Sequence, residues 1–218
     1  MEKDVTLAIA KRLKEDIEQR LATEVILTRD RDVFVPLEQR TAIANVEQAD
    51  LFISIHSNSS KNDKIAGIES FYLGLTREPR AQMLAALENA SAQQNLNELE
   101  DVIKKITMYE KMNESKEFAL KVHKKLYQTV KKLEPAARDR GVKKAPFVVL
   151  IGADVPSILL EIGFISNKRE AEIISSATTQ DKVASGISKG IEDYLAGLGT
   201  LARNPAPAEE QPANGKTR

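Results

Sequence analysis

The sequence has no cysteine and only two histidines among its 218 residues. The absence of cysteine excludes disulfides and thiolate zinc sites, although it does not fix a cellular compartment. Basic and acidic residues are equal in number, 32 each, so the charge balance gives no sign of a nucleic-acid partner. No apolar run reaches the roughly 18 residues of a membrane span, and the opening residues do not resemble an export signal.

Helical and strand patterns instead alternate along residues 1–196 and predict one α/β domain. Apolar residues recur every four positions from Val5 to Leu21, which indicates an amphipathic helix. Further helices are expected at residues 37–46, 167–175 and 181–195, and strands at residues 24–29, 51–55, 67–73, 147–150 and 156–163. The last strand is continuously apolar and should be central. We therefore expect a twisted, mostly parallel sheet with helices on both faces.

Residues 77–133 interrupt the strand pattern with a helical insertion. Helices are expected at residues 78–91, 96–112 and 115–133, and the first part of the insertion is weakly helical near Gln93, Gln94 and Asn95. The insertion is long for a plain crossover connection, so a crossover and an added regulatory segment are both open interpretations. Residues 197–218 carry no core pattern and are expected to form a disordered tail.

Two of the predicted strands end near a residue that is able to do chemistry. His56 follows the strand at 51–55, and Glu161 stands between apolar residues in the strand at 156–163. Ligands of α/β sheets gather at the carboxyl ends of the strands. Glu161 is either a rim carboxylate bonded to backbone amides or a general base beside a metal, and His56 is either a hydrogen-bonded structural residue or a metal ligand. The second histidine, His123, is expected to be partly exposed on a helix.

Five stretches together resemble one family, the zinc-dependent N-acetylmuramoyl-L-alanine amidases of bacterial cell-wall turnover. They occur in the family's order, within residues 2–195, and read EKDV (2–5), LEQRTAIAN (37–45), DLFISIHSN (50–58), GIESFY (67–72) and LEIGFISN (160–167). The insertion at residues 77–133 resembles that of the cell-division members of the family.

The resemblance implies a zinc ion held by two histidines and a glutamate, with a further glutamate in catalysis. By motif, Glu2 matches the ligand glutamate, His56 the second ligand histidine and Glu161 the catalytic glutamate. The implied substrate is peptidoglycan, cut between N-acetylmuramic acid and the L-alanine of the stem peptide. The implied location is the periplasm or the cell wall.

One departure from the family pattern concerns the first histidine ligand. The family begins with a strand and a turn that carry this histidine, and here Met1 stands directly before Glu2. We therefore expect an N-terminally shortened amidase that binds zinc weakly and is inactive, because two protein ligands do not complete a catalytic zinc site. The alternative is a non-catalytic wall-binding or regulatory module that keeps the fold.

The resemblance also implies regulation through the insertion. In related enzymes a glutamate of this segment reaches into the zinc site until an activator protein moves it. Glu98 and Glu100 are the candidates for that glutamate here, and a solvated helix face is the alternative for both. The implied partner is a division-associated activator protein.

Overall fold

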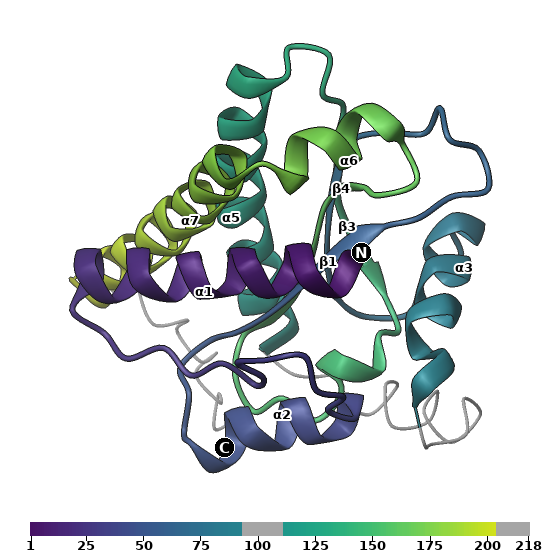
Figure 1. Ribbon diagram of the computed structural model, residues 1–218. Coiled ribbons are helices and arrows are strands. Elements are labelled where there is room, and N and C mark those ends of the chain that lie inside the picture. Colours follow the sequence, from purple (N-terminus) through teal and green to yellow (C-terminus); the bar gives the residue numbers. More distant parts are fainter. Residues whose placement is uncertain (93–110, 204–218) are drawn as a thin grey trace, which may run out of the picture.

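The computed structural model describes residues 1–92 and 111–203 (Figure 1). The described elements are α1 (Glu2–Leu21), α2 (Leu37–Val46), β1 (Phe52–Asn58), β2 (Ile68–Leu73), α3 (Pro79–Glu88), the 3₁₀ turn η1 (Asn89–Ser91), α5 (Lys111–Leu133), β3 (Asp139–Ala145), the 3₁₀ turn η2 (Val148–Leu150), β4 (Ser157–Phe164), α6 (Lys168–Ser175) and α7 (Ala177–Arg203). In this part of the chain the strands form one sheet in the order β1-β4-β2-β3. The pairs β1–β4 and β2–β3 are parallel and β2–β4 is antiparallel, so the expected mostly parallel α/β sheet is confirmed.

Strand β4 occupies the position that its composition predicts. It lies between β1 and β2, and all eight of its residues are buried. A strand covered on both faces has no need of polar alternation, which explains the continuous apolar run.

Helices cover both faces of the sheet, as expected. In Figure 1, α1, α5 and α7 lie together on one side of the sheet, and α3 lies on the opposite side. The first face buries one apolar cluster that includes Ile9, Phe118 and Ile187. The second face buries a separate cluster, contributed by α2, α3, η2 and the sheet, that includes Leu84 and Phe147.

Helix α1 confirms the four-residue spacing, because Val5, Ile9, Leu13 and Ile17 are all buried. Helices α5 and α7 cross so closely that a Cβ atom on Gly190 would come within 2.4 Å of the Cα atom of Val122. Gly190 is therefore required by the contact between the two helices.

Two predicted strands are wrong. Residues 24–29 form no strand: the backbone of Val25 is bound instead by the Lys14 and Glu18 side chains of α1. Residues 147–150 contain the 3₁₀ turn η2, whose apolar residues are buried just as a strand's would be. A short apolar run does not distinguish these two structures.

The sequence prediction also missed β3, which carries Lys143 and Lys144 and lies at the sheet edge. Gly141, with φ of +79°, lies inside this strand. Polar edge strands lack the apolar pattern by which strands are found, because one side of them remains unpaired.

The insertion and the tail also need correction. Helix α5 is a core helix of the domain, since Phe118, Val122 and Leu126 are fully buried, so residues 111–133 are not a separable insertion. Helix α7 continues to Arg203, so residues 197–203 are helical rather than disordered. The expected helix at 96–112 falls mostly outside the described residues, as does the rest of the tail. None of the described helices is long and apolar enough to cross a membrane.

Candidate active site

Strand register places three titratable side chains in one row across the sheet. His56 of β1 is paired with Glu161 of β4, and Glu161 is paired in turn with Glu69 of β2. Residues paired in register on neighbouring strands point to the same face of a sheet. That face carries the α2–α3 cluster, because Leu159 of β4 and Phe71 of β2, two residues from Glu161 and Glu69, belong to it.

Glu161 is fully buried in the middle of this row. Neither of its carboxylate oxygens has a hydrogen-bond partner among residues 1–92 and 111–203. Burial raises the pKa of Glu161 well above its usual value, and the neighbouring carboxylates act in the same direction. A buried carboxylate without a partner is costly, so this arrangement does not support a rim glutamate bonded to backbone amides.

His56 has polar neighbours on both sides of its ring. Its Nε2 atom lies 3.0 Å from the hydroxyl oxygen of Ser54. Its Nδ1 atom lies 2.9 Å from a carboxylate oxygen of Glu88 and 3.3 Å from one of Glu2. Burial alone would lower the pKa of His56, but the two carboxylates and the charge of Glu161 raise it to about 10.

Glu2 reaches this row from the first turn of α1. One of its carboxylate oxygens accepts a hydrogen bond of 3.1 Å from the backbone N–H of Ser57. The same turn is fixed by Arg29, which donates to the backbone carbonyl of Lys3 at 2.8 Å. Burial acts to raise the pKa of Glu2, but His56, the Ser57 N–H and the charge of Arg29 outweigh it and lower the pKa.

The third side chain of the row, Glu69, has a structural role. It is 1% exposed and is paired with the guanidinium groups of Arg80 and Arg140, the first at 3.1 Å. Arg80 belongs to α3, so this ion pair attaches α3 to the sheet. A buried carboxylate with two cationic partners is satisfied, which distinguishes Glu69 from Glu161.

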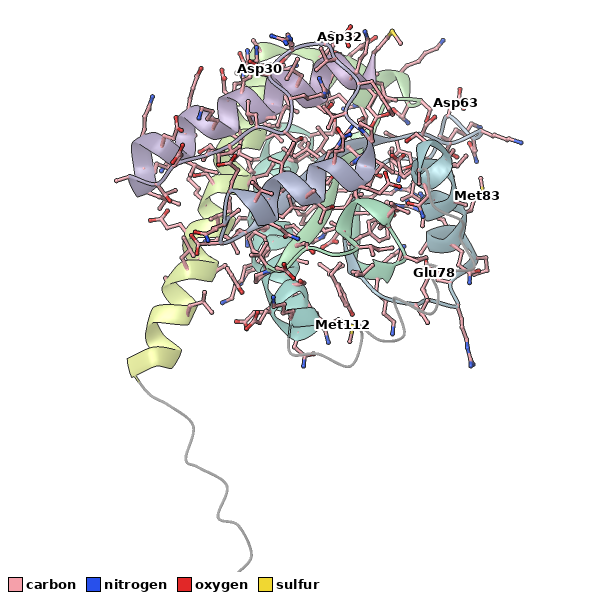
Figure 2. All side chains as sticks on the ribbon, turned by 90° about the horizontal axis from the view of Figure 1, so that it is seen from below. Asp30, Asp32, Asp63, Glu78, Met83 and Met112 are labelled. Carbon is pink, nitrogen blue, oxygen red and sulfur yellow. The ribbon has the colours of Figure 1, made fainter. Side chains whose placement is uncertain are left out.

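The other end of α3 is attached through Asn89. Its side-chain amide donates to the carbonyl of Pro146 at 2.8 Å and accepts from the N–H of Val148 at 2.8 Å. Figure 2 labels Met83 on α3 and Glu78 directly before it, and Glu78 pairs with Lys143 of β3 at 2.9 Å. These contacts fix Glu88, the last residue of α3, against His56.

A groove of about 1000 Å³ opens at the β1 edge of the sheet and ends at Glu2, His56 and Glu88. Its walls come from α1, from residues 23–28 and from β1. Asp30 and Asp32, labelled in Figure 2, belong to the segment that follows residues 23–28 and lies beside α1. Asp32 pairs with Lys3 at the start of α1, so this segment is attached at the same end of the groove.

The structure thus brings together Glu2, His56 and Glu161, the three site residues that the sequence indicates. His56 lies inside β1, two residues before its end, and not just past the strand as expected. Glu98 and Glu100 lie outside the described residues. Among those described, no group of three or more histidines, cysteines, aspartates or glutamates is arranged to hold a metal ion.

Two results differ from the sequence interpretation. Glu88 was not among the candidates, although it is the single charged residue in the second half of an otherwise mostly apolar helix. His123 is buried rather than partly exposed, and it contacts Ser70 and Asp139 at 2.8 Å each. It is a satisfied core histidine.

Comparison with known proteins identifies the family. The chain matches the family described as N-acetylmuramoyl-L-alanine amidase over residues 1–193. The amidase AmiC of Escherichia coli is 37% identical over 207 residues, which are 93% of this chain and 49% of AmiC. The chain therefore spans about half the length of that relative.

Solved structures agree. The N-acetylmuramoyl-L-alanine amidase of Clostridium difficile 630 superposes with a TM-score of 0.68 at 29% identity, covering 90% of this chain and 84% of that one. The CwlD amidase of Clostridioides difficile, solved in complex with the GerS lipoprotein, gives a TM-score of 0.64 at 25% identity, with 89% and 86% covered. Because the family match extends over residues 1–193 of 218, the chain belongs to the N-acetylmuramoyl-L-alanine amidase family.

Proposed function

We propose that this chain is the catalytic domain of a zinc-dependent peptidoglycan amidase, which hydrolyses the bond between N-acetylmuramic acid and the L-alanine of the stem peptide. The observation that carries the proposal is Glu161, a buried carboxylate without a described hydrogen-bond partner, in strand register with His56. A module that only binds the cell wall has no use for so costly a group. Family membership supplies the substrate class, and that class fits a periplasmic or cell-wall location.

The donor types around His56 suit zinc. Ser54 at Nε2 favours the tautomer that leaves Nδ1 free to coordinate, and carboxylates converge on Nδ1 from Glu2 and Glu88. Glu2 and His56 would hold the ion, and His56 would have to release its proton for this. A bound zinc ion would polarise the scissile amide carbonyl and lower the pKa of the attacking water.

Glu161 would then act as the proton carrier. It would accept a proton from the attacking water and return it to the amine of L-alanine as the amide bond breaks. Its full burial keeps bulk water away from this proton, and the strand on both sides holds the carboxylate in place.

We further propose that Glu88 is an inhibitory carboxylate. It occupies the space beside Nδ1 of His56, next to Glu2, where a zinc ion and the substrate would have to bind. Helix α3 holds it there through Arg80 and Asn89. A division-associated activator protein that displaces α3 would open the site. The complex of the related CwlD with a lipoprotein supports the idea that such amidases take protein partners.

The test measures zinc stoichiometry and cleavage of muramyl peptides for residues 1–218 and for a form extended upstream through a histidine-bearing turn. The shorter form should bind zinc weakly and be inactive, because two protein ligands do not complete the site. The extended form should bind zinc and cleave. Full activity of the shorter form would contradict the claim that zinc needs a further histidine ligand from the upstream turn.

Two variants of the extended form test the assigned roles. Glu161→Gln should keep zinc and lose about 10²–10⁴-fold in kcat, as is usual when a general base is removed. Glu88→Gln should raise basal activity instead. If the extended form binds peptidoglycan but releases no product, the non-catalytic wall-binding module is the better description.

A further inference from the structure

We propose that Arg80 and Arg140 together bind a free carboxylate of the stem peptide, on the L-alanine side of the scissile bond. Both arginines contact Glu69, the last residue of the row that His56 and Glu161 begin, so they lie on the face of the sheet that carries the candidate site. The identity of the ligand rests on the proposed function, because peptidoglycan is its source. The binding site itself rests on the contacts of the two arginines.

The same two residues hold both guanidinium groups. Nη2 of Arg80 lies 3.1 Å from Oε1 of Glu69, and Nε of Arg140 donates to the same oxygen atom. Both groups also lie over the ring of Phe164, with their central carbon atoms 5.3 and 5.5 Å from its centroid. A guanidinium over an aromatic ring keeps the N–H groups of its edge available for hydrogen bonds. Two donor groups are therefore fixed close together before a ligand binds.

The two arginines have more N–H donors than the described protein uses. A guanidinium carries five N–H groups. Arg140 donates from Nε to Glu69 and from Nη1 to the carbonyl of Ala66 at 3.1 Å, whereas Arg80 is paired through Nη2 alone. Within residues 1–92 and 111–203 their other nitrogen atoms have no hydrogen-bond acceptor. The side chains of Arg80 and Arg140 are 35% and 19% exposed, so a ligand is able to reach these donors from solvent.

The other charged groups near the pair already have partners. Lys143, a third cation near Glu69, pairs with Glu78 at 2.9 Å. Glu170 lies close enough to Arg140 to interact with its charge, but its two carboxylate oxygens each accept a backbone N–H group, at 2.8 and 2.7 Å. The two guanidinium groups therefore share one carboxylate oxygen, and a second carboxylate would give them further charge-assisted hydrogen bonds.

The position of the pair fits the peptide side of the scissile bond. Glu69 and His56 lie on either side of β4, so two strand spacings of about 4.8 Å, or about 10 Å, separate them. An extended peptide advances about 3.3 Å per residue, so about three residues cover this distance. Phe164 is the last residue of β4, at the carboxyl end of the strand, where the ligands of α/β sheets bind. A peptide cut beside His56 would therefore bring a carboxylate of its second or third residue to the arginines.

The pair is compatible with the movement of Glu88 that the proposed inhibition requires. Arg80 lies in the first turn of α3 and Glu88 is its last residue, so about 12 Å separate them along the helix at 1.5 Å per residue. Displacement of the Glu88 end leaves Arg80 on Glu69. Arg140 belongs to β3 and does not move with α3.

Peptide binding to residues 1–218, followed by NMR of the arginine Nε–Hε groups, tests the proposal without zinc or cleavage. The probe is the amide of L-alanyl-γ-D-glutamyl-L-lysine, whose one carboxylate is the α-carboxylate of D-glutamate. The matched control peptide carries a carboxamide at that position and is otherwise identical. The probe should shift the signals of Arg80 and Arg140 and bind about tenfold more tightly than the control, because it alone forms charge-assisted hydrogen bonds. Added salt should weaken its binding.

Two variants that each remove one positive charge test the assignment. Arg80→Gln should weaken binding of the probe about tenfold and leave binding of the control peptide unchanged. Arg77→Gln, at an exposed position before α3, should change neither. Arg80→Lys keeps the charge but loses the planar fork, so it should bind the probe more weakly than the wild-type chain.

The proposal is overturned if neither peptide binds, if both bind equally, if the arginine signals do not shift, or if Arg80→Gln and Arg77→Gln behave alike. The peptide pair decides the matter even if Arg80→Gln does not fold. Cleavage by the extended form without selective binding of the probe would leave the proposed function intact and refute the carboxylate site. Selective binding without cleavage would do the reverse.

Discussion

Replacing Glu161 by methionine should make the metal-free chain more stable. Glu161 is fully buried in β4 and has no hydrogen-bond partner among the described residues. Methionine has nearly the same length and no polar group, so it should fill the same space without the desolvation cost. Such a result would show that Glu161, the residue that carries the proposed chemistry, destabilises the folded protein.

The size of the effect follows from the group that is removed. Mutational data show that burial of a polar group without a hydrogen bond destabilises the folded state by about 1–3 kcal/mol. With a urea m-value of about 2–3 kcal/mol/M for a chain of this size, the midpoint should rise by about 0.3–1.5 M.

The effect should also depend on pH. Burial raises the pKa of Glu161 in the folded state above the value near 4.5 that it has when unfolded. The folded state then binds more protons than the unfolded state above pH 4.5, so the wild-type chain loses stability as the pH rises through that value. The gain from Glu161→Met should therefore be larger at pH 7 than at pH 4.

Urea unfolding of metal-free protein, followed by circular dichroism at both pH values, measures these quantities. Leu160→Met in the same strand is the control, and its cost should be below about 1.5 kcal/mol because no polar group changes. Destabilisation by Glu161→Met larger than that of the control would refute the reasoning. It would mean that the carboxylate is bonded and structural.

Three further predictions concern stability and are measured by the same unfolding assay. Gly190→Ala should destabilise the protein by about 1–3 kcal/mol, because its Cβ atom would collide with Val122. Gly197→Ala on the same helix is the control: its Cβ atom would meet no atom within 4 Å, so it should stabilise the protein by about 0.5–1 kcal/mol. Equal effects of the two variants would contradict the close crossing of α5 and α7. Glu170→Gln should lower the free energy of unfolding by about 1–3 kcal/mol, because the carboxylate accepts two backbone N–H bonds at 2.7 and 2.8 Å and an amide replaces one acceptor by a donor. An unchanged free energy of unfolding would show that water takes the place of the lost acceptor. Asn89→Ala should cost a similar amount, about 1–3 kcal/mol, because it leaves two backbone groups unpaired; an unchanged midpoint would mean that α3 is not attached there.

The core elements were predictable because their patterns record burial directly. The four-residue spacing in α1 and the apolar run of β4 each match a single packing environment. Glu2, His56 and Glu161 could be singled out as candidates because two of them interrupt or follow such patterns and because all three fall in family motifs. The pairing of His56 with Glu161 depended on strand register, and the approach of Glu2 on the packing of α1, neither of which the sequence states.

The remaining features depend on contacts that no local pattern encodes. Strand β3 is mostly polar because it is an edge strand, and η2 is apolar because tertiary packing buries it. Glu88 became a site residue only through the anchoring of α3 by Arg80 and Asn89, two contacts with residues far away in the sequence. For such residues the sequence shows a charge in an apolar helix, but not what that charge meets.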